Sequence, residues 1–360
     1  MKKFVTVVSI ALIASLLAGC KLNTNKVAEQ KSQKQVKIGA LLPLSGDYAF
    51  WGDAMRRGID MAIDEAKKEG VDLKVVYEDD QDLRPAKIVT AAKKLLEVDK
   101  IDVGVTMIIE EIRPSAPLFN DKKVPLLAVW DDNKFIRESG EYIYTNGFST
   151  EKAGEQMAEY AYNTLGLKRV AMVLHLEPWG EVISKSFTDK FKELGGEVVY
   201  SESFQRDVTD YKTTIAKIKQ LKADGVYMAL VPMTSVQFIT QAKELGLNSV
   251  LMTGDTLFQD VIDATGNAAE NIYFTNIYPS SKDYLTKKHQ DKYGSDPVNL
   301  DAISLGYDGT MKIAEAVKNA RSSGKSIKEE MDNIFGQSRA ANKEEKLFKV
   351  VSGQAEEIKP

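Results

Sequence analysis

Short β-type runs alternate with helical repeats along this 360-residue sequence, and this alternation limits the fold more than any other feature. Four runs rich in aliphatic and β-branched residues follow one another up to residue 130, separated by apolar residues at helix spacing. They are VKIGALLPL from Val36, LKVVYEDD from Leu73, IDVGVTM from Ile101 and VPLLAVW from Val124. Alternation of this kind predicts a parallel sheet that is covered by helices on both faces.

The same pattern starts again after the segment YTNGFST, residues 144–150. Four more β-type runs, again with helical repeats between them, are RVAMVLHL from Arg169, EVVYSESF from Glu197, GVYMALV from Gly225 and SVLMTGD from Ser249. A helical repeat at 302–320 and a strand pair within 347–358 come later and are too few for a third domain. We therefore predict an α/β protein with two Rossmann-like lobes.

The first twenty residues have the composition of an export signal. Lys2 and Lys3 precede an apolar run that ends in Leu-Ala-Gly-Cys at Cys20, the single cysteine. This order is typical of a secretory signal, and the apolar run is short for a membrane span. The segment resembles a bacterial lipoprotein signal, which implies that residues 1–19 are removed and that Cys20 carries diacylglycerol. An ordinary signal with a chance cysteine is the alternative.

Residues 20–35 are polar and have no apolar period, so they predict a flexible tether between the lipid and the folded body. No long apolar run follows. We therefore expect a membrane-anchored lipoprotein outside the cytoplasm, in the periplasm or on the outer face of the cell membrane.

Composition excludes several classes of function. Lys and Arg number 48 against 52 Asp and Glu, so no basic excess favours nucleic-acid binding. One cysteine excludes an internal disulfide and a multi-thiolate metal site. His175 lies in an apolar run and is expected in the core or at a cleft edge, whereas His289 lies in a charged helix and is expected in solvent.

Catalytic motifs are absent from the sequence as well. It contains no G-x-G-x-x-G, no P-loop, no HExxH and no G-x-S-x-G elbow. The acidic run at 78–82 lacks the spacing and glycine of an EF-hand loop, and we interpret it as a strand end before a helix that begins at Pro85. We therefore expect no enzyme activity, no catalytic residue, no metal and no cofactor.

A family resemblance begins in the first strand-to-helix loop, between residues 43 and 58. The motif S-G-x-x-A-x-W-G falls on Ser45, Gly46, Ala49, Trp51 and Gly52. It resembles the first loop of the leucine/isoleucine/valine-binding proteins, a branched-chain amino-acid-binding family of type I periplasmic solute-binding proteins. The resemblance continues through YEDDQDLRPAKIV, EPWGEVISKSF and LGYDGTMKIAEAV, and so covers nearly the whole mature chain.

The resemblance implies two lobes joined by three crossovers that close over a solute. The crossovers would fall near Asn146, Asn276 and Gly336. The N-terminal lobe would then comprise residues 36–146 and 277–335, and the C-terminal lobe residues 147–276 and 336–360.

In this family three of the loops that line the cleft correspond to those that carry Trp51, Trp130 and Trp179, the three tryptophans of the chain. Packing at a strand end is the alternative role for a tryptophan. Trp51 and Trp179 each precede a glycine at a strand-to-helix loop, which favours a place in the cleft. We therefore expect all three indoles to face the solute.

The family's amino-acid site carries over only in part. Its donors to the ligand carboxylate fall on or next to Ile109, Trp130 and Asp132, none of which replaces the family donor. The acidic residue that holds the ligand ammonium falls on Asp255, and Glu110 is expected to add a further carboxylate. The expected ligand-binding residues are Trp51, Ile109, Glu110, Trp130, Asp132, Trp179 and Asp255.

These observations predict the solute-binding lipoprotein of a branched-chain-amino-acid-type ABC importer, a monomer that works with a membrane permease and binds no nucleic acid. We favour a solute with a cationic group and an apolar or aromatic body. An ordinary amino acid remains the alternative if Asp132 points to solvent and a backbone amide binds the ligand carboxylate. A sensor that presents its closed form to a membrane partner and a secreted enzyme are the other two function classes.

Overall fold

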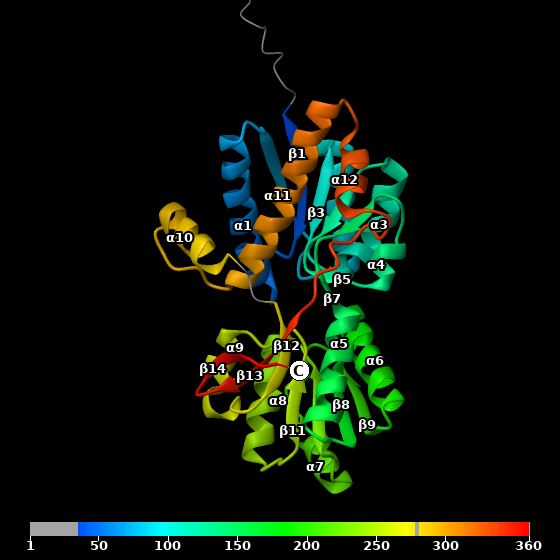
Figure 1. Ribbon diagram of the computed structural model, residues 1–360, viewed down its shortest axis with the longest axis vertical. Helices are drawn as coiled ribbons and strands as arrows, with labels where there is room; N and C mark the ends of the chain where they lie inside the picture. Colours follow the sequence, from blue (N-terminus) through cyan, green and yellow to red (C-terminus); the bar gives the residue numbers. More distant parts are fainter. Residues whose placement is uncertain (1–34, 278–280, 360) are drawn as a thin grey trace, which may run out of the picture. The chain divides into compact units, whose positions relative to one another are not determined.

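The computed structural model describes residues 35–277 and 281–359, which lie in one compact unit (Figure 1). Its first sheet has the strand order β2-β1-β3-β4-β6, and all neighbouring strands are parallel. The strands are β1 (Val36–Leu42), β2 (Leu73–Asp79), β3 (Val103–Thr106), β4 (Leu126–Ala128) and β6 (Ile143–Thr145). This sheet and the helices that pack on it are the first lobe.

The second sheet has the order β14-β13-β12-β11-β10-β8-β9. It is parallel from β9 to β12, and the last two strands are antiparallel. The strands are β8 (Arg169–His175), β9 (Glu197–Phe204), β10 (Gly225–Ala229), β11 (Val250–Thr253), β12 (Tyr273–Asn276), β13 (Lys346–Val351) and β14 (Gln354–Glu357). This sheet and its helices are the second lobe. The predicted α/β class with two Rossmann-like lobes is confirmed.

Helices cover both faces of each sheet, as the alternating pattern predicts. In the first lobe, α1 and α11 lie side by side on one face, and α2 and α3 cover the other (Figure 1). The helices are α1 (Ala49–Lys68), α2 (Pro85–Lys93), α3 (Ile109–Lys122), α4 (Lys134–Glu138), α5 (Thr150–Glu159), α6 (Pro178–Glu193), α7 (Lys212–Leu221), α8 (Pro232–Glu244), α9 (Gln259–Thr265), α10 (Lys282–Tyr293), α11 (Leu300–Ser323) and α12 (Ile327–Phe335). None of these helices is both long and apolar enough to cross a membrane.

Glycines allow α1 and α11 to pack closely. A Cβ atom on Gly58 would lie 2.0 Å from the carbonyl oxygen of Ile303, and one on Gly306 would lie 2.4 Å from that of Met55. Larger side chains would push the two backbones apart. This close pair fixes the start of α1, which carries the first cavity loop, against the remainder of the first lobe.

The chain passes between the sheets after β6, after β12 and after α12. Near the first passage, β5 (Asp131–Asp132) pairs with β7 (Phe148–Ser149) in a short parallel ribbon. The lobe boundaries near Asn146, Asn276 and Gly336 stay a proposal, which these strand memberships support.

His289 is a difference from the sequence expectation. It was expected in solvent, but it is 1% exposed on α10. Its Nδ1 lies 2.9 Å from the carbonyl oxygen of Ser295, and its ring packs on Tyr293. The reason is that one face of α10 packs against α1 and α11, so part of this polar helix is covered.

Candidate functional site

A narrow cavity lies at the ends of the parallel strands of both sheets. Its volume is about 40 Å³, room for a few water molecules. Every lining residue belongs to a segment that follows a strand, where open α/β sheets bind ligands. The lining residues are Tyr48, Trp51, Leu83, Met107, Ile108, Glu110, Trp130, Asp131, Glu177, Trp179, Val231, Asp255 and Thr256.

Five of the seven predicted ligand-binding residues line this cavity, and two do not. Trp51, Glu110, Trp130, Trp179 and Asp255 are brought together there. The two that do not line the cavity, Ile109 and Asp132, are each adjacent in the chain to a residue that does. The ligand roles of all seven stay predictions.

Aromatic rings form one wall of the cavity. The ring centroids of Tyr48 and Trp51 are 5.2 Å apart, and those of Trp51 and Trp130 are 5.6 Å apart. Phe258 packs edge-on against both tryptophans, at 5.8 and 5.9 Å. Gly52 lets this wall form, because a Cβ there would lie 1.9 Å from the carbonyl oxygen of Pro43.

Two carboxylates of the cavity each accept a hydrogen bond from the opposite lobe. Glu110 Oε1 accepts from the backbone amide of Trp179 at 3.0 Å, and Asp255 Oδ2 accepts from Trp130 Nε1 at 3.0 Å. The second oxygens, Glu110 Oε2 and Asp255 Oδ1, are buried without a hydrogen-bond partner. Burial raises the pKa of Glu110 to about 7 and also raises the pKa of Asp255.

Asp131 reaches the cavity from the ribbon strand β5, and its carboxylate covers the start of α3. Its Oδ2 accepts from the backbone amide of Ile109 at 3.0 Å. Glu111 Oε2 accepts from the amide of Ile108 at 2.7 Å. Burial, followed by the negative charges of Glu110 and Asp255, raises the pKa of Asp131 well above its usual range. The chain's own carboxylates thus accept from the amides of Ile108 and Ile109, the residue before α3 and its first residue.

The side chain of Ile109 lies in the apolar core under α3 and is fully buried. Its neighbour Ile108, the residue before the helix, lines the cavity instead. Consecutive residues at a helix start point in different directions, and this explains the difference of one residue.

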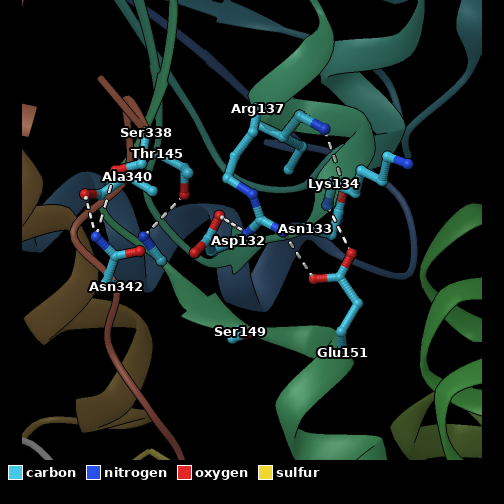
Figure 2. A network of polar contacts seen from close by, with 12 residues as sticks. Asp132, Asn133, Lys134, Arg137, Thr145, Ser149, Glu151, Ser338, Ala340 and Asn342 are labelled. Carbon is cyan, nitrogen blue, oxygen red and sulfur yellow. Dashed lines mark hydrogen bonds and ion pairs between the residues drawn. The ribbon is translucent and has the colours of Figure 1, made fainter. Parts of the chain in front are cut away.

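Asp132 belongs to an ion network on the other side of the ribbon (Figure 2). Its Oδ1 lies 2.7 Å from Arg137 Nη1, and its side chain is 2% exposed. Arg137 Nη2 also lies 3.3 Å from Glu151 Oε2, and Glu151 Oε1 accepts from the amide of Lys134 at 2.6 Å. The network joins α4 of the first lobe to α5 of the second, so Asp132 contacts these groups and does not line the cavity.

Glu177 lies at one end of the cavity and already has a cationic partner. Arg206 Nε lies 2.6 Å from Glu177 Oε1, and Arg206 Nη1 lies 3.5 Å from Asp82 Oδ2. The guanidinium carbon of Arg206 also lies 4.4 Å from the ring centroid of Tyr48. None of the described residues that line the cavity is Lys, Arg or His.

More carboxylates are buried around the cavity. Glu345 is 5% exposed, and burial and then the charge of Asp255 raise its pKa well above the usual range. Asp80 and Glu111 are fully buried, and burial raises the pKa of Asp80 to about 6. The surroundings of the cavity are therefore rich in buried carboxyl groups, which hold their protons more tightly than usual.

Sequence reasoning missed Tyr48, Asp131 and Glu177 as cavity residues. The signal that could have found them is their position, because each follows a predicted strand within a loop that enters a helix. Asp131 is adjacent to Trp130 and Asp132, and Glu177 is two residues before Trp179, so the choice among these near neighbours needed the structure.

Metal-ligating side chains do not cluster in the part of the chain that the structure describes. Among residues 35–277 and 281–359, no group of three His, Cys, Asp or Glu side chains could hold a metal ion. His175 is buried, as expected, and its Nε2 lies 3.0 Å from Thr234 Oγ1. Burial and then Arg206 lower the pKa of His175 to about 4.

Comparisons with known proteins agree with this architecture. Residues 35–336 match the family model described as a periplasmic binding protein. The Leu/Ile/Val-binding protein of Citrobacter freundii is 25% identical over 301 residues, which cover 78% of this chain and 80% of that protein.

Two solved structures share the fold. A branched chain amino acid ABC transporter protein from Thermus thermophilus with bound valine has a TM-score of 0.81 at 17% identity, covering 91% of this chain and 96% of that one. A solute-binding protein of an ABC transporter from R. palustris in complex with 4-hydroxybenzoate has a TM-score of 0.80 at 21% identity, covering 90% and 96%. At these identities the fold is shared, while the ligands belong to those proteins.

Proposed function

The chain belongs to the periplasmic binding protein family, and on that premise we propose that it delivers a cationic, amine-bearing solute to an ABC importer. Proteins of this family bind solutes outside the cytoplasm and are not enzymes. The solute class, the importer and the membrane anchor are the parts that we propose here.

The charge of the cavity supports a cationic solute. Glu110, Asp131, Glu177 and Asp255 line the cavity, and the guanidinium of Arg206, which contacts Glu177, is shared with Asp82. A buried carboxylate without a cation carries a large desolvation cost, which a bound ammonium group would offset. A cation over an aromatic face gains about 0.5–2 kcal/mol more.

The start of α3 argues against a solute carboxylate. A helix N-terminus attracts anions, but Asp131 already accepts from the amide of Ile109, the first residue of α3, and Glu111 accepts from the amide of Ile108 before it. A solute carboxylate would have to displace Asp131 and would then lie beside other negative charges. Valine and 4-hydroxybenzoate, bound by the two structural relatives, both carry a carboxylate. We therefore expect this chain to bind a different class of solute.

Calorimetry with matched pairs tests the proposal. Each pair compares an amine with the amino acid that has the same side chain: isobutylamine with valine, phenethylamine with phenylalanine, and tyramine with tyrosine. We expect the amine to bind at least tenfold more tightly in at least one pair, about 1.4 kcal/mol. Tighter binding of the amino acid in every pair that binds would overturn the proposed solute class.

A lipid anchor is the second part of the proposal. Cys20, at the end of the predicted signal, lies outside the described residues, as do the signal and nearly all of the tether. We propose that Cys20 is lipidated, since the resemblance of residues 1–20 to a lipoprotein signal implies that Cys20 becomes the new N-terminus. Membrane fractionation of Cys20→Ser tests this: the variant should be soluble or keep its signal, and a cleaved variant that stays in the membrane would contradict the anchor.

Closure around the solute is the third part. The hydrogen bonds from Trp130 to Asp255 and from Trp179 to Glu110 link the lobes across the cavity, which supports a hinge motion that forms and breaks them. Small-angle scattering should show a smaller radius of gyration with bound solute. An unchanged radius with a confirmed solute would count against closure.

A further inference from the structure

We infer that the solute carries two cationic groups, one at each end of an apolar body. This inference rests on the proposed function and narrows its solute class from amines to diamine-like molecules. It is carried by the placement of Glu110 and Asp255, which meet the cavity from different lobes and at different ends of its aromatic wall.

The aromatic wall has an acidic group at both ends. At one end the hydroxyl of Tyr48 donates to Glu177 Oε2 at 3.4 Å. At the other end Trp130 Nε1 donates to Asp255 Oδ2 at 3.0 Å. Trp51 lies between, with its ring centroid 5.2 Å from that of Tyr48 and 5.6 Å from that of Trp130. An apolar body lying along these rings would therefore have a carboxylate beyond each of its ends.

Glu110 stands at the Glu177 end of this wall. Its Oε1 accepts from the amide of Trp179, two residues after Glu177. Asp255 instead accepts from Trp130, at the opposite end of the row of rings from Tyr48. Asp131 is close to both carboxylates, because, after burial, the negative charges of Glu110 and Asp255 both raise its pKa. Glu110 and Asp255 are therefore held by different loops at the two ends of the wall.

Each of these two carboxylates has one oxygen without a hydrogen-bond partner, and for Asp255, whose pKa is raised by burial, the side chain of Trp179 also lies close enough to lower that pKa in part. Glu110 and Asp255 are 8% and 5% exposed, and Glu110 Oε2 and Asp255 Oδ1 are buried without a hydrogen-bond partner. An unpaired buried acceptor is costly, and an ammonium group supplies three donors as well as the opposite charge. A solute with one ammonium group would satisfy one of the two ends and leave the other unpaired.

No other charged group near the cavity replaces the solute in pairing with Glu110 and Asp255, or needs the solute as its own partner. Arg206 is engaged by Glu177 and Asp82, and Asp131 already accepts from the amide of Ile109. Among the described residues that line the cavity there is no cation that could pair with Glu110 or Asp255. The solute is therefore expected to supply both positive charges.

Calorimetry with amines that differ by one charge tests the inference. The probes are putrescine, cadaverine and hexamethylenediamine against butylamine, pentylamine and hexylamine, and para-xylylenediamine against para-methylbenzylamine. At about pH 8, where all these amines are charged, at least one diamine should bind tenfold or more tightly than its monoamine, about 1.4 kcal/mol.

Two conservative variants locate the charges. Glu110→Gln keeps the oxygen that accepts from Trp179, and Asp255→Asn keeps the oxygen that accepts from Trp130. Each variant should reduce the affinity for the best diamine tenfold or more and change the affinity for its monoamine less. The comparison of diamine with monoamine on the unaltered protein decides the inference even where a variant fails to fold.

The outcomes separate the two proposals. Monoamines that bind as tightly as their diamines would overturn the inference and leave the proposed function in place. Amino acids that bind while neither kind of amine does would overturn both.

Discussion

The carboxylate of Asp131 accepts a hydrogen bond from the backbone amide of Ile109, the first residue of α3, at 3.0 Å. A helix N-terminus is a favourable place for an anion, because its first amides have no partner within the helix. In this chain a side chain fills that place and brings its own charge to the cavity. The same residue therefore makes the cavity more acidic and closes the position that could hold a solute carboxylate.

Replacement of Asp131 by serine should change the preferred solute. Asp131→Ser removes one negative charge and frees the amide of Ile109, so a solute carboxylate gains a donor and loses a repulsive neighbour. We expect the ratio of amine affinity to amino-acid affinity to fall tenfold or more. Calorimetry with phenethylamine and phenylalanine measures this ratio.

Asp131→Asn is the matched control for that change. Its side-chain oxygen can still accept from the Ile109 amide, but the negative charge is gone. We expect weaker amine binding without a gain in amino-acid binding. An equal gain in amino-acid affinity in Asp131→Ser and Asp131→Asn would show that the charge of Asp131, and not the freed Ile109 amide, governs the preference.

Trp130 and Trp51 offer a matched pair for the interlobe hydrogen bond. Trp130 Nε1 donates to Asp255, whereas Trp51 Nε1 is buried without a partner, and the two indoles are 5% and 6% exposed. Replacement of either by phenylalanine removes the same volume, but only Trp130→Phe removes a hydrogen bond. In the closed, solute-bound protein, Trp130→Phe should lower the free energy of unfolding by about 1–3 kcal/mol more than Trp51→Phe does.

Chemical denaturation with saturating solute, where the lobes are closed, measures this difference, and denaturation without solute is the control. Equal loss in both variants with solute bound would mean that the bond to Asp255 contributes nothing to the stability of the closed protein.

The sequence indicated the fold and the loops of the site because both depend on short-range patterns. Alternating strands and helices determine a parallel sheet, and the ends of its strands determine where ligands bind. The three tryptophans lie in such loops, and all three line the cavity.

Which of two neighbouring residues lines the cavity depends on the direction in which each side chain points, and the pattern of strands and helices does not give this direction. Side chains of adjacent strand residues point to opposite faces, so on β5 Asp131 faces the cavity and Asp132 faces the ion network. The resemblance placed the site on or next to Asp132, and a shift of one residue reversed the face. The partner of Asp132 is Arg137, which lies on another element, α4, and no sequence motif predicts this pair.

Removal of Arg137 alone should destabilise the protein more than removal of both the Arg137 and the Asp132 charges. Arg137→Met leaves the carboxylate of Asp132 buried at 2% exposure without its cation, and we expect a loss of about 3 kcal/mol in the free energy of unfolding. Adding Asp132→Asn to that variant should recover much of the loss. Thermal denaturation of the two single variants and the double variant measures the coupling.

Asp132→Asn alone also separates the two acidic residues of β5. Since Asp132 does not line the cavity, its replacement should change the affinity for an amine by less than threefold. A loss as large as that in Asp131→Asn would instead assign the solute contact to Asp132.

Solute affinity should fall as the pH falls below about 7. Burial raises the pKa of Glu110 to about 7, so the solute-free protein begins to take up a proton on this carboxyl near that pH. A bound cation favours the ionised carboxylate and lowers its pKa, so below about pH 7 binding must release the proton. Each proton released weakens binding up to tenfold for each pH unit of acidification, about 1.4 kcal/mol.

Glu110 has a higher pKa in the solute-free protein than in the complex, so the solute-free protein holds the proton more tightly. Acid therefore stabilises the solute-free protein relative to the complex and lowers the solute affinity. Calorimetry across the neutral range, repeated in buffers of different ionisation enthalpy, gives both the affinity and the number of protons released. Glu110→Gln cannot titrate at this position and should flatten the profile between about pH 6 and pH 8. An affinity that rises on acidification would show that the solute is not bound as a cation by an ionised Glu110.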